Sequence, residues 1–523
     1  MSRSLARSTG IVGVFTLLSR LLGFVREIML ASMLGAGGRM DVFLVVLMIP
    51  NFGRRVFAEG AFSQAFVPVF TETKTRGTTE EVRDLAAVVM GTLGGVLSFI
   101  TLIGCLAAPL MIYLFAPGFR ENPEKFALSG ELLRWTFPYL MFISLTSMVG
   151  GVLNIYGRFA IPAFTPVILN VCLIASAFVD QGSVRALAYS VFAAGVLQFA
   201  FQLPAMKRLG LLPVPRWGWH DERVRRIVKL MGPVIIGSTV AQISLLLNTA
   251  LSTFTGDGSV SWLQWASRLM EFPLGVVSIA IGTATLPALS AHHAKGASDD
   301  FSATLDWSLR TVVVFALPAA LGVIWMAGPI VATTYGHGHF GAHDIRMTAY
   351  ALWAYGAGIM GFSLVKVLVP GFYARGDNRP PVRYAITGLV VGMTVNLALF
   401  ITLRFVRFPA AHVGLAVSTS LTAWINSMLL LAHLRRHQIY RPSQGWSLFL
   451  LRILLANAVM SALLLLLSGS LDSWIALNAA HRVWRLGWSI GMAILAYFGM
   501  LYALGLRLRD FRIQPRAAAG APL

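Results

Sequence analysis

Charged residues are scarce in this chain. Asp, Glu, Lys and Arg together make up 12% of the 523 residues, whereas an ordinary soluble domain contains roughly 25%. Hydrophobic residues make up 56%, and the mean hydropathy is +0.71. This composition excludes a water-soluble globular protein.

Long polar segments are missing as well. No segment between the apolar runs exceeds about 20 residues, so there is no room for a sizeable water-soluble catalytic domain. The sequence also lacks a phosphate-binding P-loop, a dinucleotide-binding glycine motif and a nucleophile elbow. We therefore expect a protein that is not an enzyme and that needs no cofactor.

Cysteine is nearly absent. Cys105 and Cys172 both lie in apolar segments, which indicates packing residues and excludes a disulfide framework. No set of Cys and His residues has the spacing of a metal site. His337, His339 and His343 share one loop, and we interpret that loop as solvated, so we expect no bound metal.

Apolar runs of about 20 residues recur along nearly the whole chain, and each is long enough to cross a hydrocarbon core of roughly 30 Å. They predict an all-α polytopic membrane protein with about fourteen transmembrane helices. The expected spans lie near 11–36, 41–70, 86–116, 131–156, 160–180, 185–206, 227–252, 260–290, 311–335, 348–373, 384–403, 412–434, 448–469 and 483–506.

Basic residues outnumber acidic ones, 42 to 22, which gives a net charge of +20. With the N-terminus inside, the cytoplasmic segments hold about 24 Lys and Arg residues and the opposite loops about 8. We therefore expect both termini in the cytoplasm. The positive charge then reflects membrane orientation and contact with anionic lipid, and it does not indicate a nucleic-acid partner.

A weak internal repeat indicates two lobes. The segment GGVLNIYGRFAIP (Gly150 to Pro162) recurs in outline as KVLVPGFYARGDNRP (Lys366 to Pro380), six spans later. An even offset preserves membrane orientation, so the lobes are expected to be related by a pseudo-two-fold axis along the membrane normal, as in some transporters. Chance similarity between two helix ends is the alternative.

The domain boundaries follow from this repeat. The expected parts are an N-terminal six-helix lobe, a basic cytoplasmic linker, a C-terminal six-helix lobe, two further helices and a basic cytoplasmic tail. In that order they cover residues 1–206, 207–226, 227–434, 435–506 and 507–523.

Several charged residues lie inside the expected spans. The motifs are SRLLGFVRE in the first span, PNFGRRVFAEGAFSQAFVP in the second and ASRLMEFP in the eighth. An arginine at the bilayer centre costs about 2.5 to 3.5 kcal/mol, so such residues usually face an interior cavity. The planar guanidinium group matches phosphate oxygens in pairs, so a cavity with several arginines suits a diphosphate. The candidate binding residues are Arg20, Arg26, Arg54 and Arg268.

An alternative is that these arginines pair with nearby acids and hold the helices together. The acids concerned are Glu27, Asp41, Glu59 and Glu271. The two interpretations are compatible if the ion pairs of the empty protein exchange for substrate phosphate. Whether Arg54 or Arg55 faces the cavity stays open.

These motifs, together with Asp41, NIYGRFAIPAFTP and VPGFYARGD, resemble the MurJ (MviN) family of lipid II flippases over nearly the whole chain. That family belongs to the multidrug/oligosaccharidyl-lipid/polysaccharide exporter superfamily, whose fold has two six-helix lobes, and its members add two C-terminal helices. The resemblance implies export of the undecaprenyl-diphosphate-linked disaccharide-pentapeptide across the bacterial cytoplasmic (inner) membrane, for peptidoglycan synthesis. This chain departs from the family pattern at two positions: Ser267 stands where many relatives have Asp, and Gly53 stands where a larger apolar residue is usual.

The resemblance assigns roles to individual residues. The four candidate arginines would hold the diphosphate, and the last two helices, with Arg452, would form a groove for the lipid tail. From the resemblance and the ion pairs considered above together, we expect gating or salt-bridge roles for Glu27, Asp41, Arg55, Glu59 and Glu271. We expect a monomer that binds lipid II and membrane lipids, with cell-wall synthesis proteins as candidate partners.

Other functions fit parts of the pattern. The same fold could export another polyprenyl-diphosphate-linked oligosaccharide, or drugs, although drug exporters usually present acidic or aromatic cavities to cations. An intramembrane phosphatase acting on lipid diphosphates and a scaffold for cell-wall enzymes are the remaining alternatives.

Overall fold

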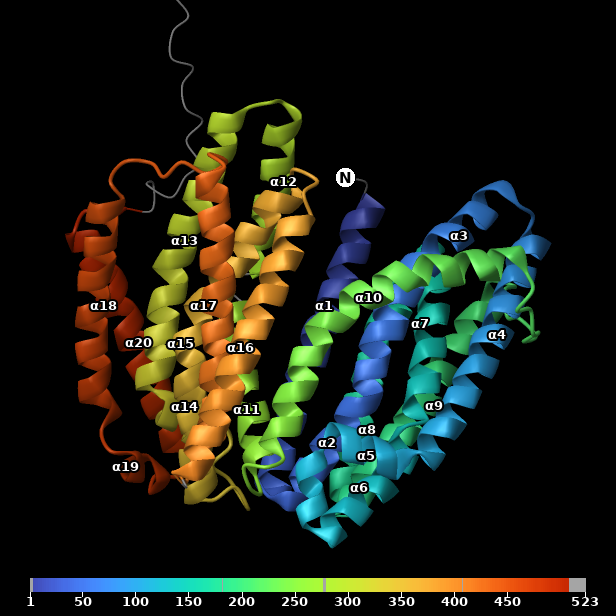
Figure 1. Ribbon diagram of the computed structural model, residues 1–523, viewed down its shortest axis with the longest axis horizontal. Helices are drawn as coiled ribbons and strands as arrows, with labels where there is room; N and C mark the ends of the chain where they lie inside the picture. The colour runs from blue at the N-terminus through green and yellow to red at the C-terminus, as the bar shows by residue number, and fades with distance from the viewer. Residues whose placement is uncertain (1–2, 181, 276–278, 407, 508–523) are drawn as a thin grey trace, which may run out of the picture. The chain divides into compact units, whose positions relative to one another are not determined.

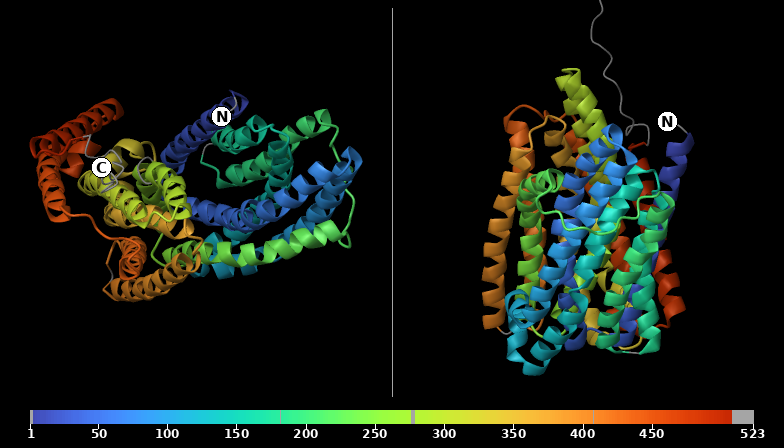
Figure 2. Two further views of the ribbon diagram at one scale, coloured as in Figure 1. Left: turned by 90° about the horizontal axis from the view of Figure 1, so that it is seen from above. Right: turned by 90° about the vertical axis from the view of Figure 1, so that its right-hand side faces the viewer.

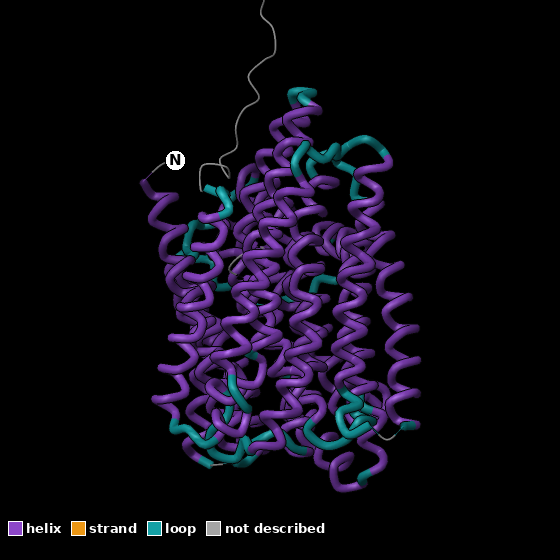
Figure 3. Tube along the Cα trace, turned by 90° about the vertical axis from the view of Figure 1, so that its left-hand side faces the viewer, coloured by secondary structure: helices purple, strands orange, loops and turns teal. Residues whose placement is uncertain are grey.

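The computed structural model describes residues 3–180, 182–275, 279–406 and 408–507 (Figure 1). Within these ranges the chain forms helices joined by loops, and it contains no strand (Figure 3). The chain divides into two compact units, Met1–Ser261 (unit 1) and Trp262–Leu523 (unit 2). The expected all-helical class is confirmed.

Unit 1 contains the first twelve elements. They are α1 (Arg3–Leu34), α2 (Gly38–Gly53), the π-helix η1 (Arg54–Phe62), α3 (Ser63–Arg76), α4 (Thr79–Leu106), α5 (Ala108–Phe115), the 3-10 helix η2 (Pro117–Glu121), α6 (Pro123–Thr136), α7 (Tyr139–Ile155), α8 (Ala160–Val179), α9 (Val184–Arg208) and α10 (Glu222–Ser252). The long helix α10, green in Figures 1 and 2, lies along η1 and α3.

The next helix, α11 (Ser259–Pro273), begins in unit 1 and continues in unit 2. The remaining helices of unit 2 are α12 (Ile279–Ala294), α13 (Ser298–Trp325), α14 (Ala327–Thr334), α15 (Ala342–Tyr373), α16 (Arg379–Phe405), α17 (Val413–Arg436), α18 (Trp446–Ser468), α19 (Leu471–Ile475) and α20 (Ala479–Ala503).

Ten helical segments of the described chain are long and apolar enough to cross a membrane. They are α4, the continuous pair α6 and α7, α8, α9, α13, α15, α16, α17, α18 and α20. The expected second span, 41–70, is divided among α2, η1 and α3. The structure therefore confirms a polytopic helical membrane protein, while the count of fourteen spans stays a prediction.

Unit 1 has a core between α3, α4 and α7. Phe62, Phe66 and Phe70 recur every four residues and therefore share one helix face. Their neighbouring rings have centroids 5.1 Å apart. Leu85 and Met148, both fully buried, pack in the same cluster. This core fixes the helix that follows η1.

Helix α15 is the centre of unit 2, because it packs against both α13 and α17. Small residues on α15 allow its backbone to lie close to that of α17. A Cβ atom on Gly358 would lie 2.5 Å from the Ser420 hydroxyl oxygen, and one on Gly361 would lie 2.9 Å from the backbone nitrogen of Trp424. Close backbone contact through small residues is typical of membrane helices.

Candidate functional site

Arg26 lies at the contact between α1 and α8. Its side chain is 15% exposed and that of the adjacent Glu27 is 10% exposed. Arg26 Nη2 donates to Glu27 Oε1 at 3.1 Å, and Nη1 donates to Asn170 Oδ1 at 2.9 Å. Asn170 in turn donates through Nδ2 to the carbonyl oxygen of Ser19 at 3.0 Å. A buried amide therefore orients the guanidinium group from the neighbouring helix.

Arg20 and Arg26 do not share a face of α1. The helix is continuous from Arg3 to Leu34, and Arg20 is exposed whereas Arg26 is half-buried. Six residues at 100° each place the two side chains about 120° apart. One ligand can reach both only if it spans neighbouring faces of this helix.

Arg54 and Arg55 begin the π-helical segment η1. Arg54 is half-buried, and its Nε donates to Asn51 Oδ1 at 3.2 Å. Arg55 is exposed, and its Nη1 donates to Gln242 Oε1 in α10 at 3.5 Å. The π-turns widen the helix directly after the proline-containing end of α2, and such segments often occur at functional sites. The predicted Glu59 side chain lies outside the described residues.

Gly53, one of the two departures, ends α2 against α7. A Cβ atom at this position would lie 2.9 Å from Leu140 Cδ1 and 3.0 Å from Leu140 Cδ2. A larger residue at this position therefore requires the Leu140 side chain to shift.

Arg268 and Glu271 form an ion pair within α11. Arg268 Nη1 lies 2.9 Å from Glu271 Oε2, with the side chains 42% and 57% exposed. The two residues are three positions apart, so they face the same side of the helix. This pair belongs to unit 2, whereas the other candidate arginines belong to unit 1.

Asp41 is almost completely buried, at 1% exposure. Its carboxylate accepts the Gly258 and Ser261 N–H groups at 2.6 and 2.9 Å and the Ser261 hydroxyl at 2.6 Å. A carboxylate suits the N-terminus of a helix, because N–H groups there are unpaired and carry partial positive charge. Asp41 thus ties α2 to the first turn of α11.

A cation from α6 lies near Asp41. Lys125 Nζ lies 3.9 Å from Asp41 Oδ2 and 2.6 Å from Asp257 Oδ1. A cavity of about 660 Å³ lies beside this group, and Arg39, Lys125, Arg185 and Asp257 contribute to its lining. Asp41 therefore has a lysine partner in the described structure, where the sequence considered only arginines.

Arg452 is half-buried on α18, which packs against α20 and α13. Both C-terminal helices present large apolar side chains outward, including Leu451, Leu454, Trp484 and Leu495. Such a surface suits contact with lipid tails, since exposed apolar area of this size is unfavourable in water.

A second buried carboxylate, Asp306 on α13, holds the segment that leads into α18. It accepts the Tyr440 hydroxyl at 2.7 Å, the Ser443 hydroxyl at 2.5 Å and the Trp446 Nε1–H at 2.7 Å. Arg310 Nε donates to it at 2.9 Å. Burial, followed by the hydrogen bond to Asp306, raises the pKa of Tyr440. These contacts fix where the C-terminal helices begin.

The histidine loop makes local contacts. His343 packs edge-on against Trp262 with ring centroids 5.4 Å apart, and His337 Nε2 lies 3.1 Å from the Thr333 carbonyl oxygen. Within the described part of the chain, no three His, Cys, Asp or Glu residues are grouped as metal ligands. Cys105 and Cys172 are free thiols.

The family model described as "Lipid II flippase MurJ" matches residues 30–483. The chain is 41% identical to the probable lipid II flippase MurJ of Vibrio cholerae over 524 residues, which is 98% of each protein. It is 38% identical to the lipid II flippase MurJ of Burkholderia cenocepacia over 520 residues, covering 97% of this chain and 99% of the relative.

The chain belongs to the MurJ family. The resemblance inferred from the motifs is thus confirmed. Members of the MurJ family are transporters rather than enzymes. Together with the ten apolar helices, family membership makes the chain a multi-pass protein of the bacterial inner membrane.

Solved structures show the same fold. A lipid II flippase MurJ in an inward closed conformation matches with a TM-score of 0.79 at 24% identity, covering 95% of this chain and 99% of that one. An inward-facing multidrug transporter, described as a MATE family member of the MOP superfamily, matches with a TM-score of 0.61 at 14% identity and covers 82% of this chain. Both matches show a shared fold.

Three polar residues at these contacts were missed by sequence reasoning. Asn170 carried a usable signal, because it interrupts the apolar run PVILNVCLIA of α8. Lys125 lies in the first turn of α6, and Asp306 precedes the expected span 311–335, so a charged residue is ordinary at either position. Only the fold shows that they contact Asp41 and the segment before α18.

Proposed function

We propose that the chain exports lipid II from the inner to the outer leaflet of the cytoplasmic membrane. The observation that carries this proposal is the similarity, over nearly the full length, to proteins named lipid II flippases. A diphosphate headgroup cannot cross hydrocarbon unaided, because burying its charges costs tens of kcal/mol on an idealised estimate. A polar path through the protein lowers that cost.

In this proposal the diphosphate interacts with Arg20, Arg26, Arg54 and Arg268 during the transport cycle. The bonds of Arg26 to Glu27 and of Arg268 to Glu271 support the idea. A phosphate oxygen can replace a carboxylate oxygen on a guanidinium group with the same geometry. Glu27 and Glu271 would then hold the arginines while the site is empty.

Asp41, Arg55 and Glu59 are assigned to gating. The attachment of Asp41 to the start of α11 supports this role, because its hydrogen bonds must break if α2 and that helix turn separate. Arg55 lies in the π-helical segment η1, an irregular stretch of helix that directly follows α2. Alternating access then follows from breaking and remaking a small number of polar contacts.

The architecture proposed for this cycle has fourteen transmembrane helices. Two six-helix lobes, 1–206 and 227–434, are related by a pseudo-two-fold axis, and the basic linker 207–226 joins them. Helices within 435–506 form the lipid-tail groove with Arg452. Residues 508–523 of the proposed tail 507–523 lie outside the described residues. The protein works as a monomer with both termini in the cytoplasm, in contact with cell-wall synthesis proteins.

The test is outer-leaflet exposure of lipid II in cells depleted of this protein, with rescue by variants at matched expression. We expect depletion to abolish exposure and the wild type to restore it. Arg20→Ala, Arg26→Ala and Arg268→Ala should fail to restore it. Arg76→Ala is the matched control, because Arg76 is 80% exposed and pairs with Glu72 in the same helix.

Normal exposure after depletion, in cells without a second flippase, would reject lipid II as the substrate. Another polyprenyl-diphosphate-linked oligosaccharide, or a drug, would then be the candidate cargo. Full rescue by the three arginine variants would reject the arginine site, but lipid II would remain the proposed substrate.

A further inference from the structure

The linker, residues 207–226, exposes apolar side chains although it joins two helices outside the expected spans. Leu211 and Pro213 are buried, whereas Leu212 and Val214 are exposed, Val214 at 76%. Alternation with a period of two is typical of an extended segment with two distinct faces. In this segment Leu211 packs in the core of unit 1, whereas Leu212 and Val214 are exposed.

Two partly exposed tryptophans follow this segment. Trp217 and Trp219 are 59% and 44% exposed, and their rings stack with centroids 6.4 Å apart and planes 18° apart. An indole combines an apolar ring with one N–H donor, so tryptophan is enriched where hydrocarbon meets the lipid headgroups.

The backbone of the linker is fixed against α4. The Arg216 N–H donates to the Ala87 carbonyl oxygen at 3.0 Å, and the Gly218 N–H donates to the Thr92 hydroxyl at 3.0 Å. A Cβ atom on Gly91 would lie 2.3 Å from the Arg216 carbonyl oxygen, so only glycine permits this approach. The contacts hold the tryptophans beside residues 87–95, near the start of the expected span 86–116.

The linker carries six basic and two acidic residues. Some of this charge is compensated, because Asp84 accepts hydrogen bonds from Arg216 and Arg223. Arg223 also binds Asp221, and this hydrogen bond lowers the pKa of the Asp221 carboxyl group. Arg226 pairs with Glu72 at 2.8 Å.

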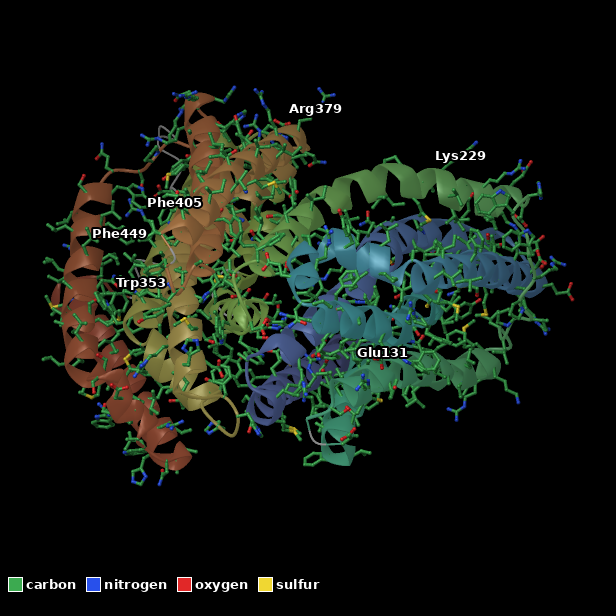
Figure 4. The ribbon with its side chains drawn as sticks, turned by 60° about the horizontal axis from the view of Figure 1, so that its bottom comes forward. Glu131, Lys229, Trp353, Arg379, Phe405 and Phe449 are labelled. Atoms are coloured by element: carbon green, nitrogen blue, oxygen red, sulfur yellow. The ribbon has the colours of Figure 1, made fainter. Side chains whose placement is uncertain are left out.

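Four other cations in and beside the linker are solvent-accessible in the structure. Lys207, Arg208, Arg225 and Lys229 are all exposed. Figure 4 shows Lys229 projecting away from the ribbon of α10. They flank the exposed apolar face on both sides in the sequence. An apolar face with tryptophans and flanking cations matches a membrane surface rich in anionic headgroups.

We propose that the linker is a binding site for anionic phospholipid at the cytoplasmic membrane surface. Val214, Trp217 and Trp219 enter the boundary between headgroups and acyl chains, and the four exposed cations contact lipid phosphates. Attraction to an anionic surface corresponds to about a 5-fold gain in affinity per cation. The site concerns the surrounding bilayer and does not depend on which substrate is carried.

The first test measures the thermal unfolding midpoint of the purified full chain in neutral detergent, titrated with phosphatidylglycerol or phosphatidylcholine. The linker variant replaces the four cations by glutamine: Lys207→Gln, Arg208→Gln, Arg225→Gln and Lys229→Gln. The control makes the same charge change at exposed positions of α16 and α17: Arg379→Gln, Arg383→Gln, Arg435→Gln and Arg436→Gln.

Phosphatidylglycerol should raise the midpoint of the wild type and of the control, and phosphatidylcholine should do so much less. The linker variant should need at least 10-fold more phosphatidylglycerol for the same shift. An equal response of the linker variant and the control would overturn the proposal. So would a linker variant that loses function in cells with unchanged lipid affinity, because that result indicates an acidic protein partner.

The second test locates the apolar face in the bilayer. A nitroxide is attached at Val214→Cys, or at the water-facing control Glu80→Cys, in a chain with Cys105→Ala and Cys172→Ala that unfolds at the wild-type midpoint. In phosphatidylglycerol vesicles the label at 214 should collide more with oxygen than with a water-soluble nickel chelate, and the label at 80 should do the reverse. Equal access of the nickel chelate to both positions would overturn the proposal.

Discussion

Single polar residues buried between helices determine how the charged side chains of unit 1 are held. Asn170 is 6% exposed and joins Arg26 to the carbonyl oxygen of Ser19. A buried guanidinium group needs acceptors for its donors, since each unmet bond carries a desolvation cost. Asn170, a neutral residue, therefore orients the Arg26 guanidinium group by hydrogen bonding.

Asn170→Ala should lower the free energy of unfolding by about 1–3 kcal/mol, because it leaves buried donors and acceptors on α1 without this partner. It should also weaken rescue of lipid II exposure, since Arg26 loses its orientation. Calorimetry of the purified chain and the cellular assay measure the two effects. The control is Asn154→Ala, at an exposed position of α7. An unfolding midpoint equal to that of the control would contradict this role.

At the scale of elements, two connections position whole helices: the junction of α2 with η1, and the segment before α18. Gly53 faces Leu140 at the first, and Asp306 gathers four side-chain donors at the second. Gly53 and Asp306 thus make their contacts at points where one helical element ends and the next begins.

Gly53→Val should destabilise the chain by about 1–3 kcal/mol, because added methyl groups overpack the contact with Leu140. The double variant Gly53→Val with Leu140→Ala should recover part of that loss, and a double-mutant cycle of unfolding free energies measures the coupling. Strictly additive effects would show that the two side chains do not meet.

Asp306→Ala should destabilise unit 2 by about 3–5 kcal/mol, the range for removing one partner from a buried ion pair. Limited proteolysis should then cut between residues 437 and 446 much faster, because Tyr440, Ser443 and Trp446 lose their shared acceptor. Asp299→Ala, at an exposed position in the first turn of the same helix, is the control. Cleavage at the same rate in both variants would argue against the anchoring role.

For the whole molecule, composition and periodicity predicted the helical membrane class, because apolar runs must satisfy their backbone groups within helices. Motifs predicted the family, and charges inside apolar runs indicated Arg26 and Arg268. Their partners were harder to predict. Asn170 and Lys125 lie 144 and 84 positions from the residues they contact, and the π-helical turns of η1 leave no periodic signal in a nine-residue segment.

Membrane voltage should act on the complete cycle. A cytoplasm-negative potential drives anions outward by about 2.3 kcal/mol per elementary charge per 100 mV, so it should accelerate export if the loaded protein moves net negative charge. Vesicles with an imposed potassium gradient and valinomycin provide the measurement. Export at the same rate with and without the potential would exclude voltage as the driving force.

The most direct test of the account is lipid II flux in vesicles that contain only this purified protein. A quencher or enzyme added outside reports the fraction of labelled lipid II in the exposed leaflet over time. We predict rapid transfer by the wild type and by Arg76→Ala, and loss of transfer by Arg26→Ala and Arg268→Ala that remain folded. Transfer at the wild-type rate by both arginine variants, or none by the wild type, would contradict the account.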